Sequence, residues 1–370
     1  MITRRSFLLA PAVLAACGRR KGSGFDGYAF VANQEGRAVA AVDLIAFAVA
    51  RHIRLDAGPT AIAADPLRPA VYALTPETGS IHEIGADTLA LRRSLRAARI
   101  AVSMRISPDG RSLWLLAAQP RQLLRVSTES LRVESRIALP ADPVDFDLGP
   151  NGELAAVSFG PAGAVGIVNL SRGTCSWTGL GKNLSLVRFR SDGRQLLAGN
   201  TEDRALTILD VPAGRAIVNL PLVVRPDYFC FGASQGQLFV TGEGMDSVVI
   251  VYPYLTEVAE TILAGKSPGA MAEAVGENFD FLLVANAQSN EVTIIDIETH
   301  RVVAVVAVGQ EPGAITITPD GQYALVLNRV SGDIAVIHLG AITATRSRSA
   351  PLFTMIPVGS KPVGAVVRGV

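Results

Sequence analysis

A turn that recurs about every 42 residues is the feature that most limits what this chain can fold into. The spacings between successive copies are 41, 42, 42, 41, 43, 42 and 43 residues. A steady period of ~40 to 45 residues is the length of one four-stranded blade of a β-propeller. Eight copies therefore predict eight blades. The copies begin at Phe25, Pro66, Pro108, Pro150, Ser191, Ser234, Gly276 and Pro319.

The segments between the turns have the composition of short strands. Residues 276–331 contain four apolar runs rich in Val, Ile and Thr, each too short for a stable helix and each closed by a turn such as Pro319-Asp320-Gly321. Val302–Val308 is apolar without strict alternation, which predicts a strand covered on both faces. No stretch has the pattern of a long amphipathic helix, so the period indicates an all-β ring rather than a helical solenoid.

The two ends of the repeat array predict how the ring closes. The final run, Gly364–Val370, starts no blade of its own, so we expect it to be the innermost strand of the blade whose other strands are N-terminal. Cys175–Gly181 is the poorest strand, and seven blades is the alternative if it is a loop. The last unit carries an insertion at residues 342–351 that includes the basic run Arg346-Ser347-Arg348.

Recurring short runs carry a family resemblance. Runs such as VAN, LLAGN, LLVAN and ALVLN, followed by TIIDIET or LTILDVP and then V-G-x-x-P-G-A, resemble the YVTN family of β-propeller repeat proteins. The resemblance covers nearly all of residues 25–370, is strongest over Gly265–Asn328, and is weakest in units three and four, where the terminal Asn is missing. It implies a propeller fold and a protein-interaction role in exported or surface proteins of bacteria and archaea.

The N-terminus predicts export. Arg4 and Arg5 precede Ser-Phe-Leu-Leu in a pattern that resembles the twin-arginine signal. Residues 8–16 form an apolar segment that is too short to span a membrane stably. We therefore expect residues 1–16 to be a signal peptide.

The segment that follows predicts a lipid anchor. Leu14-Ala15-Ala16-Cys17-Gly18 resembles a bacterial lipobox, in which the thiol of Cys17 takes the diacylglycerol. An ordinary secretory signal with an accidental cysteine is the alternative. Residues 17–24 would then be the lipidated cysteine and a flexible tether, and residues 25–370 a single propeller domain.

Composition excludes some partners. The net charge of +1 provides no electrostatic footprint for nucleic acid, and 49% hydrophobic residues suffice for a large core.

Cys175 and Cys230 fall at different strand positions, so we expect two small buried hydrophobic residues rather than a disulfide.

Motifs for catalysis or cofactors have simpler explanations. Gly265–Gly269 satisfies G-x-S-x-G, but the segment recurs as Gly309–Gly313 and Gly359–Pro362 without the serine, so it is predicted to be a turn between blades. The chain lacks C-x-x-C-H, and its four histidines fall on outer strands or their turns in separate units. No cofactor and no metal site is expected.

The predicted channel carries alternating charges. With the strands of a blade lettered a to d from the axis outward, Arg105, Asp147 and Arg188 occupy the same place on successive a strands, and Asp65 and Arg190 lie two places further along. These charges predict ion pairs between blades around the axis. Mutual neutralisation is the favoured interpretation, and a pocket for a small anionic or zwitterionic ligand is the other.

The b-to-c and d-to-a loops share the wider channel mouth, where loops on a rigid scaffold are the usual place for binding. Asparagines also end b strands here, and we expect them to cap turns. The charged residues predicted at the mouth are Arg225, Asp227, Lys266, Glu311 and Lys361. The asparagines are Asn33, Asn200, Asn286 and Asn328.

These features together predict an exported propeller, anchored to a membrane through lipid on Cys17, that acts as a scaffold for an envelope protein or a small polar ligand. The sequence favours a role without catalysis. A propeller-type lactonase at the channel mouth and an accessory to a periplasmic oxidoreductase are the alternatives.

Overall fold

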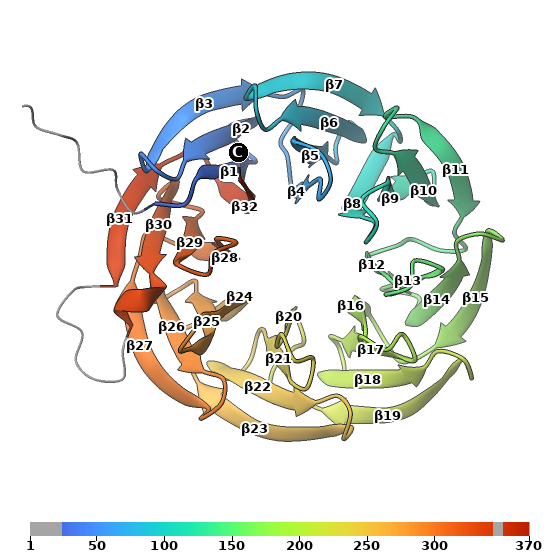
Figure 1. The fold of residues 1–370 in the computed structure, drawn as a ribbon. Coiled ribbons are helices and arrows are strands. Elements are labelled where there is room, and N and C mark those ends of the chain that lie inside the picture. Colours follow the sequence, from blue (N-terminus) through green and yellow to red (C-terminus); the bar gives the residue numbers. More distant parts are fainter. Residues whose placement is uncertain (1–23, 343–350, 370) are drawn as a thin grey trace, which may run out of the picture.

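The computed structural model describes residues 24–342 and 351–369, which form 32 strands in eight four-stranded antiparallel sheets. The sheets are arranged around a central axis as an eight-bladed β-propeller (Figure 1). The predicted all-β propeller fold is confirmed. The seven-blade alternative is wrong, because the weak segment forms β15 (Thr174–Gly179) and pairs fully with β14 (Ala164–Asn169).

Each blade, numbered 1 to 8 from the N-terminus, has one strand at each of the positions a to d. The a strands, nearest the axis, are β32 (Pro362–Gly369), β4 (Ala61–Ala64), β8 (Ile100–Ile106), β12 (Asp145–Leu148), β16 (Leu184–Phe189), β20 (Tyr228–Phe231), β24 (Pro268–Val275) and β28 (Pro312–Ile317). The b strands are β1 (Gly27–Asn33), β5 (Ala70–Thr75), β9 (Ser112–Gln119), β13 (Leu154–Phe159), β17 (Gln195–Asn200), β21 (Leu238–Thr241), β25 (Asp280–Asn286) and β29 (Tyr323–Asn328).

The outer half of each blade follows the same order. The c strands are β2 (Ala38–Asp43), β6 (Ser80–Gly85), β10 (Gln122–Ser127), β14, β18 (Ala205–Asp210), β22 (Ser247–Tyr252), β26 (Glu291–Asp296) and β30 (Asp333–His338). The d strands, on the circumference, are β3 (Ala48–Arg54), β7 (Ala90–Arg96), β11 (Val133–Ala138), β15, β19 (Arg215–Pro221), β23 (Glu257–Leu263), β27 (Arg301–Ala307) and β31 (Leu352–Pro357). A short 3-10 helix, Leu339–Ala341, follows β30.

The ring is closed by the two ends of the described chain. β32 pairs antiparallel with β1, from Gly27 opposite Gly369 to Asn33 opposite Pro362. The predicted closure is confirmed, and the strand begins at Pro362, slightly earlier than expected. The pairing covers the inner edge of β1, which would otherwise be unpaired.

The core lies between blades rather than inside any one of them. Leu325 and Leu327 of β29 pack in one cluster with Ala29 and Val31 of β1, the b strand of the next blade. A single blade is too thin to bury its own apolar faces, so each blade depends on its neighbours for its hydrophobic stabilisation.

The outermost strands are more exposed than their sequences suggest. Val302–Val308 was expected to be covered on both faces, but this segment is the d strand β27, in which Val302 is 44% and Val305 is 55% exposed. The prediction is wrong because the edge position of this strand, which its apolar composition does not reveal, leaves its side chains uncovered.

The asparagine that ends a b strand contacts the glycine of the neighbouring d-to-a turn. Asn286 lies opposite Pro268 at the start of the a strand, and a Cβ on Gly265 would lie 2.7 Å from the Cγ of Asn286. Gly309 approaches Asn328 in the same way. The asparagine side chains bond within the protein, as when Nδ2 of Asn33 donates to the carbonyl of Val358 at 2.7 Å. The expected role of these asparagines at turns therefore agrees with their contacts.

Arg4, Arg5, Cys17 and the basic run Arg346–Arg348 lie outside the described residues. Within the described residues, no helix has the length and apolar character needed to cross a bilayer.

Deleting residues 364–370 should greatly destabilise the protein. The β1–β32 ladder is lost, and at about 1 kcal/mol for each hydrogen bond this removes a large part of a typical stability of about 5 to 15 kcal/mol. A thermal melt measures the effect. Arg368→Ala is the control, since this side chain makes one long hydrogen bond, 3.3 Å, to the carbonyl of Arg68. A deletion variant that melts within a few degrees of the wild type would contradict closure by β32.

Candidate functional site

Polar side chains from different blades meet at three places. The channel cluster comprises Arg105, Asp145, Asp147 and Arg188 on the a strands of blades 3 to 5. The mouth pocket lies where blades 6 to 8 begin their a strands. The inter-blade groove lies between blades 3 and 4, at the end of the ring opposite the mouth.

The channel cluster joins three blades by ion pairs. Nε of Arg105 on β8 lies 3.7 Å from Oδ1 of Asp147 on β12, so the predicted pair between neighbouring blades is present. Asp145 lies two residues before Asp147 and so points to the same side of β12. It pairs with Arg188 on β16 and lies 3.8 Å from Arg105. Asp145 was not predicted from the sequence, although its spacing from Asp147 was a usable signal.

Backbone groups complete the cluster. Nε of Arg105 donates to the carbonyl of Phe146 at 2.6 Å, and Oδ2 of Asp147 accepts from the N–H of Phe189 at 2.9 Å. Burial raises the pKa of Asp147, and burial together with the charge of Arg188 lowers the pKa of Arg105. Two cations and two anions balance here, and each contacts a neighbouring blade. The arrangement suits mutual neutralisation better than capture of a charged ligand.

Asp65 and Arg190 do not join the channel cluster. Asp65 pairs with Arg68 at 2.7 Å, and Arg190 pairs with Asp192, so both close their own a-to-b turns. The expectation of inter-blade pairs is wrong for these two residues. They lie past the last residues of β4 and β16, where the chain has already turned away from the axis.

The mouth pocket brings together part of the predicted set. Arg225, Asp227 and Glu311 line a cavity of about 380 Å³. Arg225 pairs with Asp227 at 2.8 Å and also with Glu243, and Arg329 pairs with Glu311 at 3.2 Å. Most of the charge in the pocket is therefore already neutralised by neighbours.

Lys266 and Lys361 lie in d-to-a loops, as predicted, but they do not line this pocket, and two residues that do line it were missed. Lys361 pairs with Glu35 of blade 1 at 3.5 Å, and the side chain of Lys266 is exposed. Neither lines the pocket. Glu243 and Arg329 were missed, although they lie two residues and one residue after b strands and so belong to the b-to-c loops that were expected at this face.

The turn at Gly265–Gly269 is not a nucleophile elbow. It connects strand β23 to strand β24, whereas the elbow of a hydrolase joins a strand to a helix. The predicted turn between blades is confirmed.

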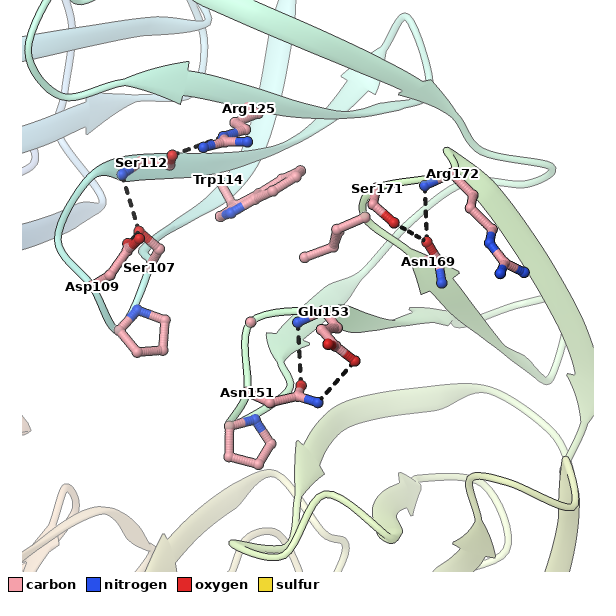
Figure 2. Close-up of a pocket in the computed structure, with 14 residues that line it drawn as sticks. Ser107, Asp109, Ser112, Trp114, Arg125, Asn151, Glu153, Asn169, Ser171 and Arg172 are labelled. Atoms are coloured by element: carbon pink, nitrogen blue, oxygen red, sulfur yellow. Dashed lines mark hydrogen bonds between the residues drawn. The ribbon is translucent and has the colours of Figure 1, made fainter.

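The inter-blade groove was not anticipated from the sequence. It is a cavity of about 560 Å³ formed by the a-to-b turns of blades 3 and 4, the c-to-d turn of blade 4, and three side chains of blade 3. Figure 2 shows the indole of Trp114 lying between the Ser112–Arg125 pair and the turn that carries Ser171 and Arg172. The groove exists only once two units are packed, so the pattern of each unit alone could not reveal it.

Hydrogen bonds hold the polar walls of the groove in place. Nε of Arg125 donates to Oγ of Ser112 at 2.8 Å, and Oγ of Ser171 donates to Oδ1 of Asn169 at 2.9 Å (Figure 2). The guanidinium of Arg172 forms no ion pair with any residue that the structure describes, and it is exposed. The groove therefore offers a free cation beside prearranged hydroxyl and amide groups.

A pair of carboxyl groups lies at the contact between blades 6 and 7. Oε1 of Glu273 on β24 and Oδ1 of Asp280 on β25 are both buried. Burial, with the charge of Asp280 adding to it, raises the pKa of Glu273 to about 7. Burial next to Glu273 also raises the pKa of Cys230 to about 12, so this thiol is unreactive. Cys175 and Cys230 are free, as expected, but both are only partly buried.

Comparisons with known proteins show the fold and no family. No protein-family model matches the chain, and no curated protein matches it. Dihydro-heme d1 dehydrogenase NirN, solved in complex with DHE, is similar with a TM-score of 0.74 and 15% identity, over 92% of this chain and 75% of that chain. Kuenenia stuttgartiensis hydrazine synthase has a TM-score of 0.58 and 17% identity, over 88% of this chain and 99% of that chain. At these identities the similarity shows the propeller fold alone.

The histidines of this chain do not suit a haem-type group such as the one for which NirN is named. Histidine is one of the axial ligands that hold haem iron in proteins. His52 and His82 lie on β3 and β6, His300 precedes β27, and His338 ends β30, all away from the a strands. His82 is buried, and both of its ring nitrogens already have hydrogen-bond partners: Nδ1 lies 2.9 Å from Oγ of Ser94, and Nε2 lies 2.9 Å from Oδ1 of Asp56.

The pKa of Glu273 predicts how stability depends on pH. The pKa in the folded state, about 7, lies above the ordinary value of 4.5. The folded state therefore holds the proton more tightly, and this contribution to stability is full below pH 4.5 and is lost as the pH rises through about 7. Glu273→Gln should flatten the dependence, as measured by urea unfolding at pH values on both sides of that range. The exposed Glu277→Gln is the matched control, and an unchanged slope in the Glu273 variant would refute the assignment.

Proposed function

We propose that this chain is an exported, lipid-anchored propeller that acts as a binding scaffold in the cell envelope, with the inter-blade groove as the site for a small polar ligand. The observation that carries the proposal is that this groove is lined both by Trp114 and by Arg172, whose guanidinium forms no ion pair with any described residue. Trp114 lies on strand β9, and Arg172 lies in the short turn that joins β14 to β15, so little backbone ordering is needed when a ligand binds. In the channel cluster and the mouth pocket, by contrast, the arginines are paired.

We also propose membership of the YVTN family. Its support is the recurrence of Asn at the ends of b strands together with Gly and Pro at the d-to-a turns, as at Asn286, Gly265 and Pro268. The contact between these asparagines and glycines gives the pattern a structural reason.

An accessory role to a periplasmic oxidoreductase is the second candidate. It is favoured by the similarity in fold to NirN, which is named as a dehydrogenase, and by the twin-arginine-like segment with Arg4 and Arg5. The role would use the same scaffold and requires no cofactor in this chain.

Lipid attachment is tested by the mass of the mature protein. We expect a chain that begins at Cys17 and carries the added mass of a diacylglyceryl group, because the thiol of Cys17 lies directly after the small residues of the predicted cleavage site. Cys17→Ser should lack the added mass in the same host. A mature wild-type chain with no lipid, or one cut elsewhere, would show that the cysteine is accidental.

Ligand binding to the groove is tested by thermal shift with sugar acids, amino acids and dicarboxylates. A ligand at about 100 times its dissociation constant adds about 2.7 kcal/mol of stability, which corresponds to a rise in Tm of a few degrees. Arg172→Ala should abolish the rise. Arg215→Ala, an exposed arginine next to the equivalent turn of blade 5, should retain it. A shift that is equal in both variants would place the ligand elsewhere.

A further inference from the structure

Charge is divided unequally around the ring. Blades 1 to 3, residues 24–140 and 358–369, carry 16 Lys and Arg against 11 Asp and Glu. The described part of blades 4 to 8, residues 141–342 and 351–357, carries 11 Lys and Arg against 22 Asp and Glu. A chain with a net charge of only +1 therefore has one positive sector and one strongly negative sector.

The excess of the positive sector lies on its circumference. Six exposed arginines on or beside the d strands of blades 1 to 3, here called the arginine arc, form no side-chain ion pair or hydrogen bond within the described residues. By comparison, the d strands of blades 4 to 8 contain two arginines, Arg215 and Arg301, and a third, Arg172, lies in the turn before β15. The arginine arc consists of Arg51, Arg54, Arg96, Arg99, Arg132 and Arg136.

The arc is continuous along one side of the ring. β3, β7 and β11 follow one another on the circumference (Figure 1). Other arginines of this region are already neutralised, since Arg92 and Arg93 pair with Glu83, and Arg121 pairs with Asp142. The six guanidinium groups of the arc are exposed and lie on or beside the outermost strands of three consecutive blades.

The proposed lipid anchor would hold this edge of the ring near a membrane. Cys17 precedes the first described residue, Gly24, by seven residues, which span at most about 25 Å when fully extended. Gly24 lies against Leu44 of blade 1, which is one end of the positive sector. The sequence between Cys17 and Gly24 also contains Arg19, Arg20 and Lys21.

We propose that the arginine arc docks on a bilayer of anionic phospholipids. The inference rests on the proposed lipid anchor, which would hold blade 1 close to the surface. Guanidinium groups bind phosphate oxygens in a bidentate manner, and basic residues next to an anionic leaflet are attracted within about a Debye length. The acidic blades 4 to 8 are repelled by the same surface. The ring therefore stands on its edge, with the channel axis along the plane of the membrane.

Vesicle sedimentation tests the arc without the lipid anchor. The protein is the full chain with Cys17→Ser, and the vesicles are phosphatidylcholine alone or mixed with phosphatidylglycerol. The arc variant is Arg54→Gln, Arg96→Gln and Arg136→Gln. The control variant, matched in charge, is Arg194→Gln, Arg215→Gln and Arg301→Gln on blades 5 and 7. All three proteins share residues 1–23, so differences between them report the propeller.

Each arginine that is removed should lower the affinity for anionic vesicles about fivefold. The arc variant, which lacks three, should therefore bind on the order of 100-fold more weakly than the parent protein, while the control variant should bind as tightly as the parent. Salt of about 1 M should remove the difference. Equal binding by the arc and control variants, or equal binding to neutral vesicles, would overturn the proposal. Self-association without vesicles that the arc variant loses would assign the arc to contact with a second copy, and would also overturn it.

This result is independent of the anchor test. Since Cys17 is replaced in every protein used for sedimentation, a failure of the arc to bind vesicles would not change the mass measured for the mature wild type. A wild type without lipid would in turn disprove the lipid anchor, but it would not change the binding of these proteins to vesicles. Near-identical thermal melts of the arc and control variants show that both fold.

Discussion

The pairing of β32 with β1 is the constraint on which the rest of the structure depends. It brings Gly369 opposite Gly27, residues from the two ends of the chain, and so turns a row of eight sheets into a ring. The apolar clusters span neighbouring blades, as where β29 meets β1, and blades 8 and 1 can share such a cluster only when the ring is closed. Closure therefore stabilises packing far beyond the two strands that form it.

Every polar site described above is built at a junction between units. The channel cluster uses three blades, the mouth pocket three, and the inter-blade groove two. The scaffold repeats, but the residues at equivalent turns differ, so each junction has its own chemistry. Trp114 and Arg172 distinguish the junction of blades 3 and 4, whereas Glu273 and Asp280 distinguish the junction of blades 6 and 7.

The sequence predicted the fold well because its period, its turns and its closing strand can be recognised from short stretches of sequence, without knowing which residues pack against them. It also predicted the pair of Arg105 and Asp147, because equivalent places on neighbouring a strands must lie close together. The sequence-based predictions were wrong where the position or the partner of a side chain depended on its neighbours in the folded structure. Asp65 and Arg190 found partners in their own turns, and the valines of β27 lie at an edge that composition does not reveal. The groove needed two packed units before it existed.

The opposite charges of the two sectors give the molecule a large electric dipole in the plane of the ring. Cations that diffuse toward it meet an attractive potential over blades 4 to 8, and anions meet one over blades 1 to 3. Encounter rates with charged solutes would therefore depend on the side of approach and fall as ionic strength increases, even for a solute that finally binds at a neutral site.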